Sequence, residues 1–310
     1  MKISKTLKLI TKVVLSILLI YYALRSVDFF LIISSLKSAR PRLIGVAAAL
    51  IAVGYLISAL RWQILLKSQN ITISLLDLVK MYLVGSFFNN FLPTTIGGDV
   101  VRTYDVSKVA DSIPRSFAVI IVERLTGIFA LICYAFLGVF LKGDRLGNIY
   151  LVWMTGGAFI CILSGVILGT RFFGKIPPSE KGHKVLDPVR MKIFRVFNSL
   201  SYFKNKKNIL QAVFLAFVLQ FNVIIFYFFI AKALWLDPPF YYFLIIVPLA
   251  HVIFMFPISI NGIGVRENVF ILFLSKINIA TASAIALSWI SFALVLAYAL
   301  IGGAIYAVRK

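Results

Sequence analysis

Residues 86–108 read SFFNNFLPTTIGGDVVRTYDVSK, and this stretch decides the fold that the sequence predicts. An apolar segment runs into two asparagines, is interrupted at Pro93, and resumes after Gly97 and Gly98. Proline removes a backbone donor and disrupts the preceding helical turn, whereas glycine permits positive φ and lets a ligand approach the backbone. The stretch therefore predicts a helix that breaks and restarts, with Asp99 at or near the N-cap of the second helix.

A second stretch with the same pattern lies late in the chain, at residues 256–267, FPISINGIGVRE. In both stretches an arginine follows the proline at the same offset: Arg102 after Pro93, and Arg266 after Pro257. Because the two breaks match, we predict that they form two halves of one site inside a membrane. The alternative interpretation is an ordinary Pro/Gly loop between two spans in each case, with both arginines at the water interface.

The composition indicates a membrane protein that crosses the bilayer several times. Hydrophobic residues make up 61% of the chain, above the ~45–50% that is usual for soluble domains, and several apolar runs approach the ~20 residues that cross a bilayer. The net charge is +21, from 32 basic and 11 acidic residues. Basic residues collect in cytoplasmic loops and face anionic lipid, so a nucleic-acid partner is not predicted.

The order of apolar segments predicts an all-α integral membrane protein with about six full transmembrane helices and two re-entrant hairpins. The full spans are expected at 9–24, 43–60, 115–141, 149–170, 209–236 and 279–308. We expect residues 1–310 to form a single transmembrane domain, whose parts are a first half (about 1–170) with a re-entrant hairpin at 72–109, a basic cytoplasmic loop at 171–208, and a second half (209–310) with a re-entrant hairpin at 239–276.

Charge also predicts the orientation in the cytoplasmic membrane. If each hairpin enters and leaves on one side, both termini and the basic loop lie in the cytoplasm, as the excess of Lys and Arg there requires. The two hairpins then enter from opposite sides, which is the inverted repeat that many transporters use. Residues 26–42 predict a helix lying at the interface, and Arg61 with Trp62 is expected to mark another interface.

Two charged residues, Glu123 and Arg124, stand inside the apolar segment 115–141. A charge at that depth costs from ~2.5 to well above 10 kcal/mol, so it indicates a functional site. The residues either contact a ligand or form structural ion pairs, for example Asp99 with Arg124 and Glu123 with Arg102. Both interpretations stay open at this point.

Other polar residues of the breaks carry the same ambiguity. Asn89, Asn90 and Asn261 can cap broken helix ends or bind a head group, and capping is the favoured role. Glu267 stands beside an arginine and can balance it or contact a ligand. His251 is expected to hydrogen-bond a backbone carbonyl group.

The chemistry of the breaks suits a phosphate-bearing lipid head group. Free N–H groups at a helix start bind anions, and an arginine one turn later can hold a phosphate through two hydrogen bonds. The predicted head-group site consists of Asn90, Pro93, Thr94, Gly97, Gly98, Asp99, Arg102, Glu123, Arg124, Asn261, Gly262, Gly264, Arg266 and Glu267. The sequence contains no recognisable metal cluster, nucleotide loop or catalytic triad, so we expect no catalytic residue, metal or cofactor.

Three ordered motifs resemble the lysylphosphatidylglycerol synthase transmembrane-region family: NFLPTTIGGDVVR from Asn90, VERLTG at 122–127, and PISINGIGVRE at 257–267. This family includes the flippase-like membrane half of the multiple peptide resistance factor and stand-alone proteins. The resemblance implies an all-helical membrane protein that moves a lipid between leaflets. The motif residues that carry over are Pro93, Gly97, Gly98, Asp99, Arg102, Glu123, Arg124, Gly127, Pro257, Gly262, Gly264, Arg266 and Glu267.

In two-part members of that family, a separate soluble domain transfers lysine from its tRNA to phosphatidylglycerol. The sequence ends at Lys310, directly after the last span, so we expect no lysyl transfer and no enzyme activity. The expected function is a lipid flippase for an anionic phospholipid or a polyprenyl-phosphate-linked lipid, acting alone or as a homo-oligomer. The alternative is a membrane-embedded transferase for a polyprenyl phosphate or phospholipid in envelope glycan or lipid assembly, with Asp99 or Glu123 as its base.

Overall fold

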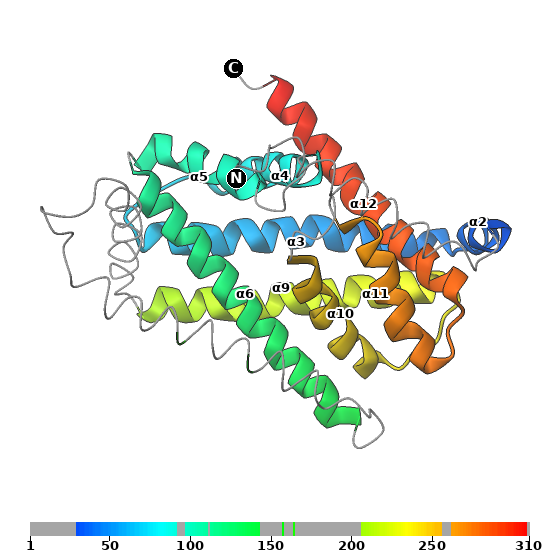
Figure 1. Cartoon of the computed structure of the whole chain (residues 1–310). Helices are drawn as coiled ribbons and strands as arrows, with labels where there is room; N and C mark the ends of the chain where they lie inside the picture. The colour runs from blue at the N-terminus through cyan, green and yellow to red at the C-terminus, as the bar shows by residue number, and fades with distance from the viewer. Residues whose placement is uncertain are drawn as a thin grey trace, which may run out of the picture.

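The computed structural model describes residues 29–91, 97–110, 112–142, 206–255 and 262–308, together with residues 157 and 164. Within these ranges the chain forms helices and no strand, so the all-α prediction is confirmed (Figure 1). The elements are α2 (Phe29–Lys37), α3 (Pro41–Lys67), α4 (Leu75–Phe91), α5 (Gly97–Ala110), α6 (Ile113–Lys142), α9 (Lys206–Ala233), α10 (Phe240–Met255), α11 (Val265–Leu274), the 3-10 turn η3 (Ser275–Ile277) and α12 (Thr281–Val308).

Among the described helices, α3, α6, α9 and α12 are long and apolar enough to cross a bilayer. They correspond to four of the predicted spans, and each must cover a hydrocarbon layer of about 30 Å. The predicted span 9–24 lies outside the described residues, as do nearly all of the span 149–170 and of the basic loop 171–208. The membrane class is therefore established, and the total of six spans stays a prediction.

The helices α3 and α9 form the central antiparallel pair of the fold (Figure 1). At one end of the pair, the amide of Arg40 donates to the carbonyl oxygen of Ala233 at 2.8 Å. At the other end, Nδ2 of Asn208 donates to Oγ of Ser68 at 3.1 Å. These contacts fix the register of two helices that lie far apart in the sequence, and the remaining elements pack around them.

Both predicted breaks are present, and each separates two short helices. The helix α4 has 17 residues and α5 has 14, while α10 has 16 and α11 has 10. At 1.5 Å per residue the longest of them reaches about 25 Å, so each is too short to cross the bilayer upright. The open end of the α4–α5 pair and that of the α10–α11 pair lie at opposite ends of the α3–α9 pair (Figure 1).

The glycine pair after the first break has a different role from the one predicted. Gly97 and Gly98 are helical, so the positive φ that glycine permits is not used at this pair. The reason is helix packing: a Cβ built on Gly98 would lie 2.1 Å from the carbonyl oxygen of Gly85. Gly98 therefore lets the backbones of α4 and α5 touch, and a ligand does not occupy that space.

In the second break the glycines do adopt left-handed backbone, with φ of 72° at Gly262 and 82° at Gly264. Such angles are costly for residues with a Cβ, so glycine is required for the turn into α11. Here the prediction of positive φ is confirmed. The two breaks thus share a sequence pattern but use their glycines for different purposes.

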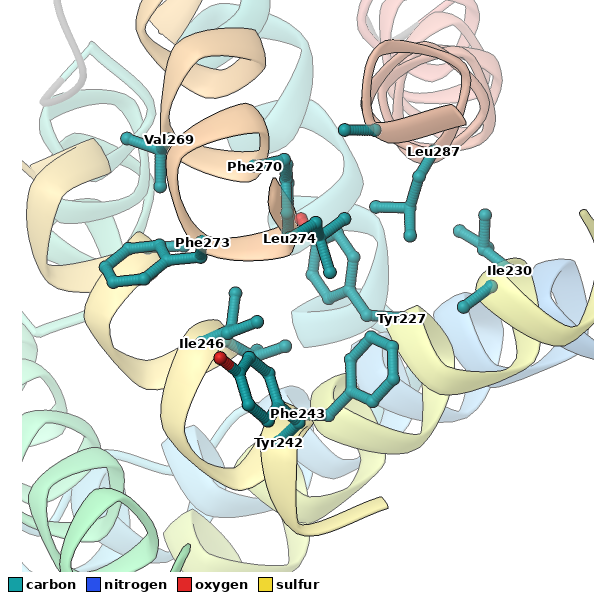
Figure 2. Close-up of a cluster of buried hydrophobic side chains, with 14 of the residues drawn as sticks. Tyr227, Ile230, Tyr242, Phe243, Ile246, Val269, Phe270, Phe273, Leu274 and Leu287 are labelled. Atoms are coloured by element: carbon teal, nitrogen blue, oxygen red, sulfur yellow. The ribbon is translucent and has the colours of Figure 1, made fainter. Parts of the chain in front are cut away.

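Two apolar clusters fix the short helices to the long ones. The larger one joins α9, α10, α11 and α12 through fully or almost fully buried side chains (Figure 2). Its largest members include Tyr227, Phe243, Phe270 and Leu274. The smaller cluster joins α3, α4 and α5 through buried residues that include Trp62 and Val106. Each hairpin therefore has its own hydrophobic attachment.

Arg61 and Trp62, which were expected to mark an interface, are buried inside the protein. The helix α3 continues past both residues to Lys67, and only 5% of Arg61 and 1% of Trp62 are exposed. The sequence pattern of an arginine beside a tryptophan at the end of an apolar run is typical of a membrane boundary. In this protein the same pair points inward, because Arg61 has an acidic partner on α6.

Candidate functional site

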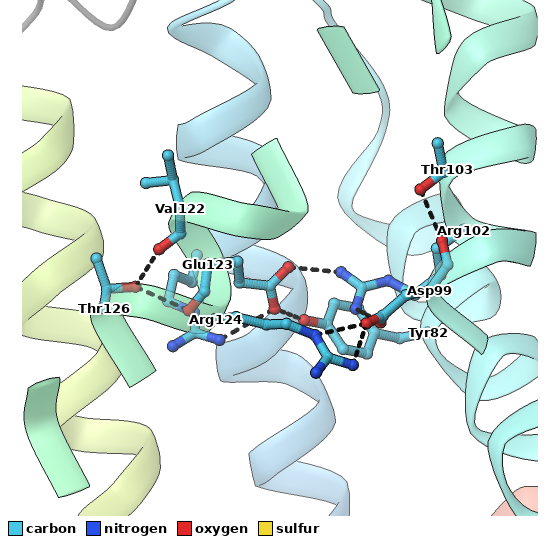
Figure 3. A network of polar contacts seen from close by, with 9 residues as sticks. Tyr82, Asp99, Arg102, Thr103, Val122, Glu123, Arg124 and Thr126 are labelled. Atoms are coloured by element: carbon cyan, nitrogen blue, oxygen red, sulfur yellow. Dashed lines mark hydrogen bonds and ion pairs between the residues drawn. The ribbon is translucent and has the colours of Figure 1, made fainter. Parts of the chain in front are cut away.

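Glu123 is the centre of a buried network of charges in the middle of α6 (Figure 3). Its Oε1 accepts hydrogen bonds from Nη2 of Arg61, at 3.0 Å, and from the hydroxyl group of Tyr82. Its Oε2 accepts from Nη2 of Arg102 at 2.7 Å. Only 4% of Glu123 is exposed. Helices α3, α4, α5 and α6 therefore meet at one carboxylate.

The second carboxylate of the network is Asp99, in the first turn of α5. Nε of Arg124 donates to its Oδ2 at 2.7 Å, and Nη1 of Arg102 lies 3.5 Å from its Oδ1. The pairs Asp99–Arg124 and Glu123–Arg102 are thus both confirmed as ion pairs. A buried charge that has lost its partner is strongly destabilising, so these pairs fix the positions of α5 and α6.

Arg102 is also held by aromatic rings. The carbon Cζ of its guanidinium group lies 4.1 Å from the ring centroid of Trp62 and 3.7 Å from that of Tyr82. Its aliphatic stem lies close to Gly85, where an added Cβ would come within 2.9 Å of Cδ. Arginine favours such stacked positions because its planar cation is attracted to ring faces. The position of Arg102 is therefore rigidly defined.

Arg61 is the member of the charge network that the sequence interpretation missed. The signal that identifies it is the continuation of apolar residues after it: residues 62–66 read WQILL, which is unusual for a chain leaving the membrane. A charge followed by another turn of apolar helix needs an intramembrane partner. Arg61 and Glu123 carry opposite charges within two apolar helical segments. This pattern indicates an ion pair between them.

The starts of α5 and α11 are closed by side chains of the protein itself. The amide of Gly98 donates to Oδ1 of Asn89 at 2.7 Å, and the amide of Gly264 donates to Oε2 of Glu267 at 2.7 Å. Ser288 also donates to Glu267, at 3.3 Å. Capping by Asn89 is confirmed, while Nδ2 of Asn90 bonds the carbonyl oxygen of Ser86 at 2.8 Å. These helix starts are therefore less available to a ligand than the sequence suggested.

A cavity of about 260 Å³ opens beside the charge network. Its lining includes the network arginines and both carboxylates, and it also includes Gln220 of α9 and His251 and Met255 of α10. The first hairpin and one arm of the second hairpin therefore border the same space. Its volume lies just below the range of about 300–1,000 Å³ that is typical of drug-sized ligands, so it suits a lipid head group.

The cavity is cationic, and some nitrogens of the arginines beside it are buried without a hydrogen-bond partner. Three guanidinium groups (Arg61, Arg102 and Arg124) stand against two carboxylates, and Nε and Nη1 of Arg61 and Nε of Arg102 have no hydrogen-bond partner. Gly127 keeps space open here. A Cβ built on Gly127 would lie 3.5 Å from Nε2 of Gln220 and 3.6 Å from Nη1 of Arg61. An anion in the cavity would lie against a network in which three guanidinium groups outnumber two carboxylates.

Arg266, the matching arginine of the second break, does not line this cavity. Its guanidinium carbon lies 5.5 Å from the ring centroid of Phe254 and 4.8 Å from that of Phe292, and its Nε is buried without a partner. The prediction that Arg102 and Arg266 face one shared space does not hold in this conformation. The predicted residues Pro93, Thr94 and Asn261 lie outside the described residues.

His251 lies between two cavities. It borders the cationic cavity and also a second one of about 190 Å³, which Tyr55, Asn222 and Tyr227 help to line. Its Nδ1 is 3.0 Å from the carbonyl oxygen of Val247. A carbonyl oxygen only accepts, so Nδ1 carries the proton, and the predicted bond to the backbone is confirmed. The His251 side chain therefore lines both cavities.

The chemistry of the site is that of ion pairs and hydrogen bonds. Within the described ranges, the structure has no group of three or more His, Cys, Asp or Glu side chains that suits a metal ion. The arrangement can hold an anion and exchange it for water or lipid. Both carboxylates are fully occupied by cationic partners, so the site offers no unpaired carboxylate among the residues that the structure places.

Comparison with known proteins identifies one family. The model described as "Lysylphosphatidylglycerol synthase TM region" matches residues 9–303. The UPF0104 membrane protein PH1989 of Pyrococcus horikoshii is 26% identical over 184 residues, which cover 58% of this chain. The match spans 55% of that protein, about half of its length. No solved structure matches the chain.

Proposed function

Since this chain belongs to the lysylphosphatidylglycerol synthase TM region family, we propose that it is a lipid flippase that holds a phosphate-bearing head group in the cationic cavity and moves it between leaflets. Family membership confirms the resemblance found in the three motifs. The family match concerns a membrane region, and a lipid-related membrane role agrees with both comparisons. Transport of a lipid by this chain is our proposal.

One observation carries the proposal: three arginine side chains and two carboxylates line the same cavity, which leaves one positive charge in excess. The arginines are Arg61, Arg102 and Arg124. Arg124 lines the same space with a side chain that is 38% exposed, so it can reach an entering ligand. Phosphate oxygens are strong acceptors for guanidinium groups. The head group would occupy the cavity while the acyl chains stay in the lipid.

The position of the two helix breaks supports a transport mechanism with two opposed halves. Each short helix is too short to cross the bilayer, and the open ends of the two hairpins lie at opposite ends of the α3–α9 pair (Figure 1). Transporters built from inverted repeats place their substrate sites at such broken helices. We propose that both hairpins are re-entrant and that relative motion of the two halves opens the cavity to each leaflet in turn.

Cysteine labelling tests this topology. In a background with Cys133 and Cys161 replaced by alanine, Thr72→Cys and Lys108→Cys, at the two ends of the first hairpin, are expected to react with a membrane-impermeant maleimide from the same side. Both positions are exposed, so a reagent can reach them. Labelling is measured in right-side-out and inverted vesicles.

The second hairpin provides the matched comparison. Asp237→Cys and Lys276→Cys, also exposed, are expected to react together from the opposite side. A hairpin whose two ends label from different sides crosses the membrane, and that result would remove the inverted-repeat arrangement. Protein solubilised in detergent serves as the control for full reactivity of each cysteine.

Transport is tested with purified protein in liposomes that contain a fluorescent phosphatidylglycerol, whose outer-leaflet fraction is quenched by dithionite. The wild-type chain is expected to expose the inner-leaflet lipid. Arg124→Gln is expected to reduce the transport rate by about tenfold or more, because a charge-assisted contact worth at least ~1.5 kcal/mol to the head group is lost. Asp99 keeps Arg102 as a partner in this variant, so the fold should be preserved.

Arg115→Gln is the control for this measurement. Arg115 lies on the same helix, α6, but is exposed and is not among the residues that line the cavity. It is expected to transport at the wild-type rate. Equal rates for Arg124→Gln and Arg115→Gln, at equal thermal stability, would show that the cavity does not hold the transported head group.

A membrane-embedded transferase is the weaker alternative. It requires Asp99 or Glu123 to act as a base on a bound lipid. Asp99 is paired with two arginines, and Glu123 is paired with two arginines and a tyrosine. A carboxylate that is paired with arginines is favoured in its charged form and is a poor proton acceptor. These contacts favour binding and transport over chemistry at the head group.

A further inference from the structure

We infer that the second cavity, of about 190 Å³, is an uncharged subsite that accepts hydrogen bonds from the far end of the head group whose phosphate lies in the cationic cavity. This inference rests on the proposed function and adds the chemistry of the group beyond the phosphate. That group is a hydrogen-bond donor, either a hydroxyl or an ammonium group. Two side chains of the second cavity provide the acceptors, Asn222 of α9 and His251 of α10.

The two cavities follow each other along the α3–α9 pair, and His251 lines both of them. On α9, Gln220 lines the cationic cavity and Asn222 lines the second one. On α3, Arg61 lines the cationic cavity and Tyr55 lines the second one. At 1.5 Å per residue these spacings correspond to about 3 Å along α9 and about 9 Å along α3. A single head group with its phosphate in the cationic cavity can therefore extend into the second.

Asn222 has a buried side-chain amide without a hydrogen-bond partner among the residues that the structure describes. Only 9% of the residue is exposed. Unlike the enclosed nitrogens of Arg61, its unpaired amide atoms retain accessible surface. A Cβ built on Gly54, which lines the same cavity, would lie 3.2 Å from Oδ1 of Asn222. A buried polar group without a partner is destabilising, so a ligand that pairs with this amide is favoured.

His251 presents a second acceptor. Its Nδ1 donates to the carbonyl oxygen of Val247 at 3.0 Å, one turn earlier on α10. In the neutral ring Nε2 is then an acceptor. Because Nδ1 faces the backbone of its own helix, Nε2 lies on the edge of the ring that is directed away from α10. The ring packs against Tyr227 with centroids 5.8 Å apart, which fixes its orientation.

These acceptors are complementary to a hydrogen-bond donor. Among the described residues that line the second cavity, none carries a charge. A hydroxyl group donates one hydrogen bond and an ammonium group donates three. The volume of about 190 Å³ lies below the ~300–1,000 Å³ that is typical of drug-sized ligands, so the cavity suits a group of a few heavy atoms. The arginines would thus hold the phosphate, while Asn222 and His251 hold the group attached to it.

Lipid binding to the purified chain, measured by native mass spectrometry, tests this subsite. The probes share dioleoyl chains: phosphatidylglycerol, phosphatidylethanolamine, and phosphatidylpropanol, which is phosphatidylglycerol without its two hydroxyl groups. The wild-type chain is expected to bind phosphatidylglycerol about three- to tenfold more tightly than phosphatidylpropanol. Asn222→Leu keeps the approximate size of the side chain and removes its amide. It is expected to weaken the two donor-bearing lipids by about three- to tenfold and to leave phosphatidylpropanol unchanged.

Gln211→Leu is the matched control for this variant. Gln211 is an exposed residue of the same helix and is not among the residues that line either cavity. It should leave all three affinities unchanged. His251→Phe keeps an aromatic ring and removes both nitrogens, and it is expected to act as Asn222→Leu does. Thermal unfolding of each variant verifies that the fold is intact, and His251→Phe decides the question if Asn222→Leu does not fold.

The outcomes separate the inference from the proposed function. If Asn222→Leu weakens all three lipids equally, or none of them, the second cavity does not bind donor groups, and the cationic cavity keeps its assignment. If Arg124→Gln leaves the binding of phosphatidylpropanol unchanged, the proposed phosphate site itself is refuted. A loss in Asn222→Leu that is confined to phosphatidylglycerol or to phosphatidylethanolamine supports the subsite and identifies its donor as hydroxyl or ammonium, respectively.

Discussion

Replacing Glu123 with alanine is expected to lower the free energy of unfolding by about 3–5 kcal/mol. The change leaves Arg61 without its acidic partner and removes one of the two carboxylates that hold Arg102. Both arginines are almost fully buried, so water cannot replace the lost carboxylate. Four helices meet at this side chain, and the loss is therefore expected to affect the whole first half of the fold.

This expectation is checked by unfolding in mixed micelles, followed by tryptophan fluorescence. The control is Asp77→Ala, which removes an exposed carboxylate paired with Lys80 and should cost less than ~1 kcal/mol. Glu123→Gln keeps the shape of the side chain but loses its charge, and should fall between the two. If Glu123→Ala unfolds with the same midpoint as Asp77→Ala, the network does not stabilise the fold.

Replacing Gly98 with alanine is expected to have a similarly large effect, about 3 kcal/mol, at the upper end of the usual cost of overpacking. The new Cβ would lie 2.1 Å from the carbonyl oxygen of Gly85. That neighbour is backbone, so it cannot move aside by changing a rotamer, and α4 and α5 must separate. Separation also moves Asp99 and Arg102, which lie one residue and one turn further along α5.

Gly45→Ala is the matched control for this change. Gly45 is also helical, and a Cβ built there has no atom within 4 Å. Alanine is favoured over glycine in a helix by up to about 1 kcal/mol, so Gly45→Ala should be neutral or stabilising. The two variants are compared by thermal unfolding in detergent. A Gly98→Ala protein as stable as Gly45→Ala would mean that the two helices are not in direct backbone contact.

The fold class and the helix breaks were readable from the sequence because their signals are local. Apolar runs of the length of a bilayer predict membrane helices, and Pro93 and Pro257 mark the two places where a run cannot continue. The structure has helix ends at Phe91 and Met255, directly before these breaks. The insertion of the hairpins from opposite sides is a property of the whole topology and stays a prediction.

The candidate site was only partly predictable. Asp99, Arg102, Glu123 and Arg124 stand out as charges beside or inside apolar segments, and complementary charge was enough to suggest their pairing. The pairing of Arg61 with Glu123 was not predicted, because an arginine followed by tryptophan is also common at membrane boundaries. The role of Gly98 was not predicted either, because a glycine pair after a break is compatible with either a turn or close packing, and only the position of α4 distinguishes the two.

Arg266 shows the limit of arguments from repeated motifs. Its offset from the proline equals that of Arg102, yet it lies between Phe254 and Phe292 and away from the cationic cavity. Equal spacing fixes where a residue stands along its own hairpin. It does not fix what lies opposite, because the elements that face the two hairpins are different.

The helix α12 touches both hairpins, and this has a mechanical consequence. Near its start, Ser288 bonds Glu267 at the beginning of α11; near its end, a Cβ on Gly302 would lie 1.9 Å from the carbonyl oxygen of Leu83 in α4. Between these points the helix contains no proline, so it acts as a stiff rod about 21 Å long at 1.5 Å per residue. If the two halves move as proposed, we expect α12 to carry a displacement of one hairpin directly to the other.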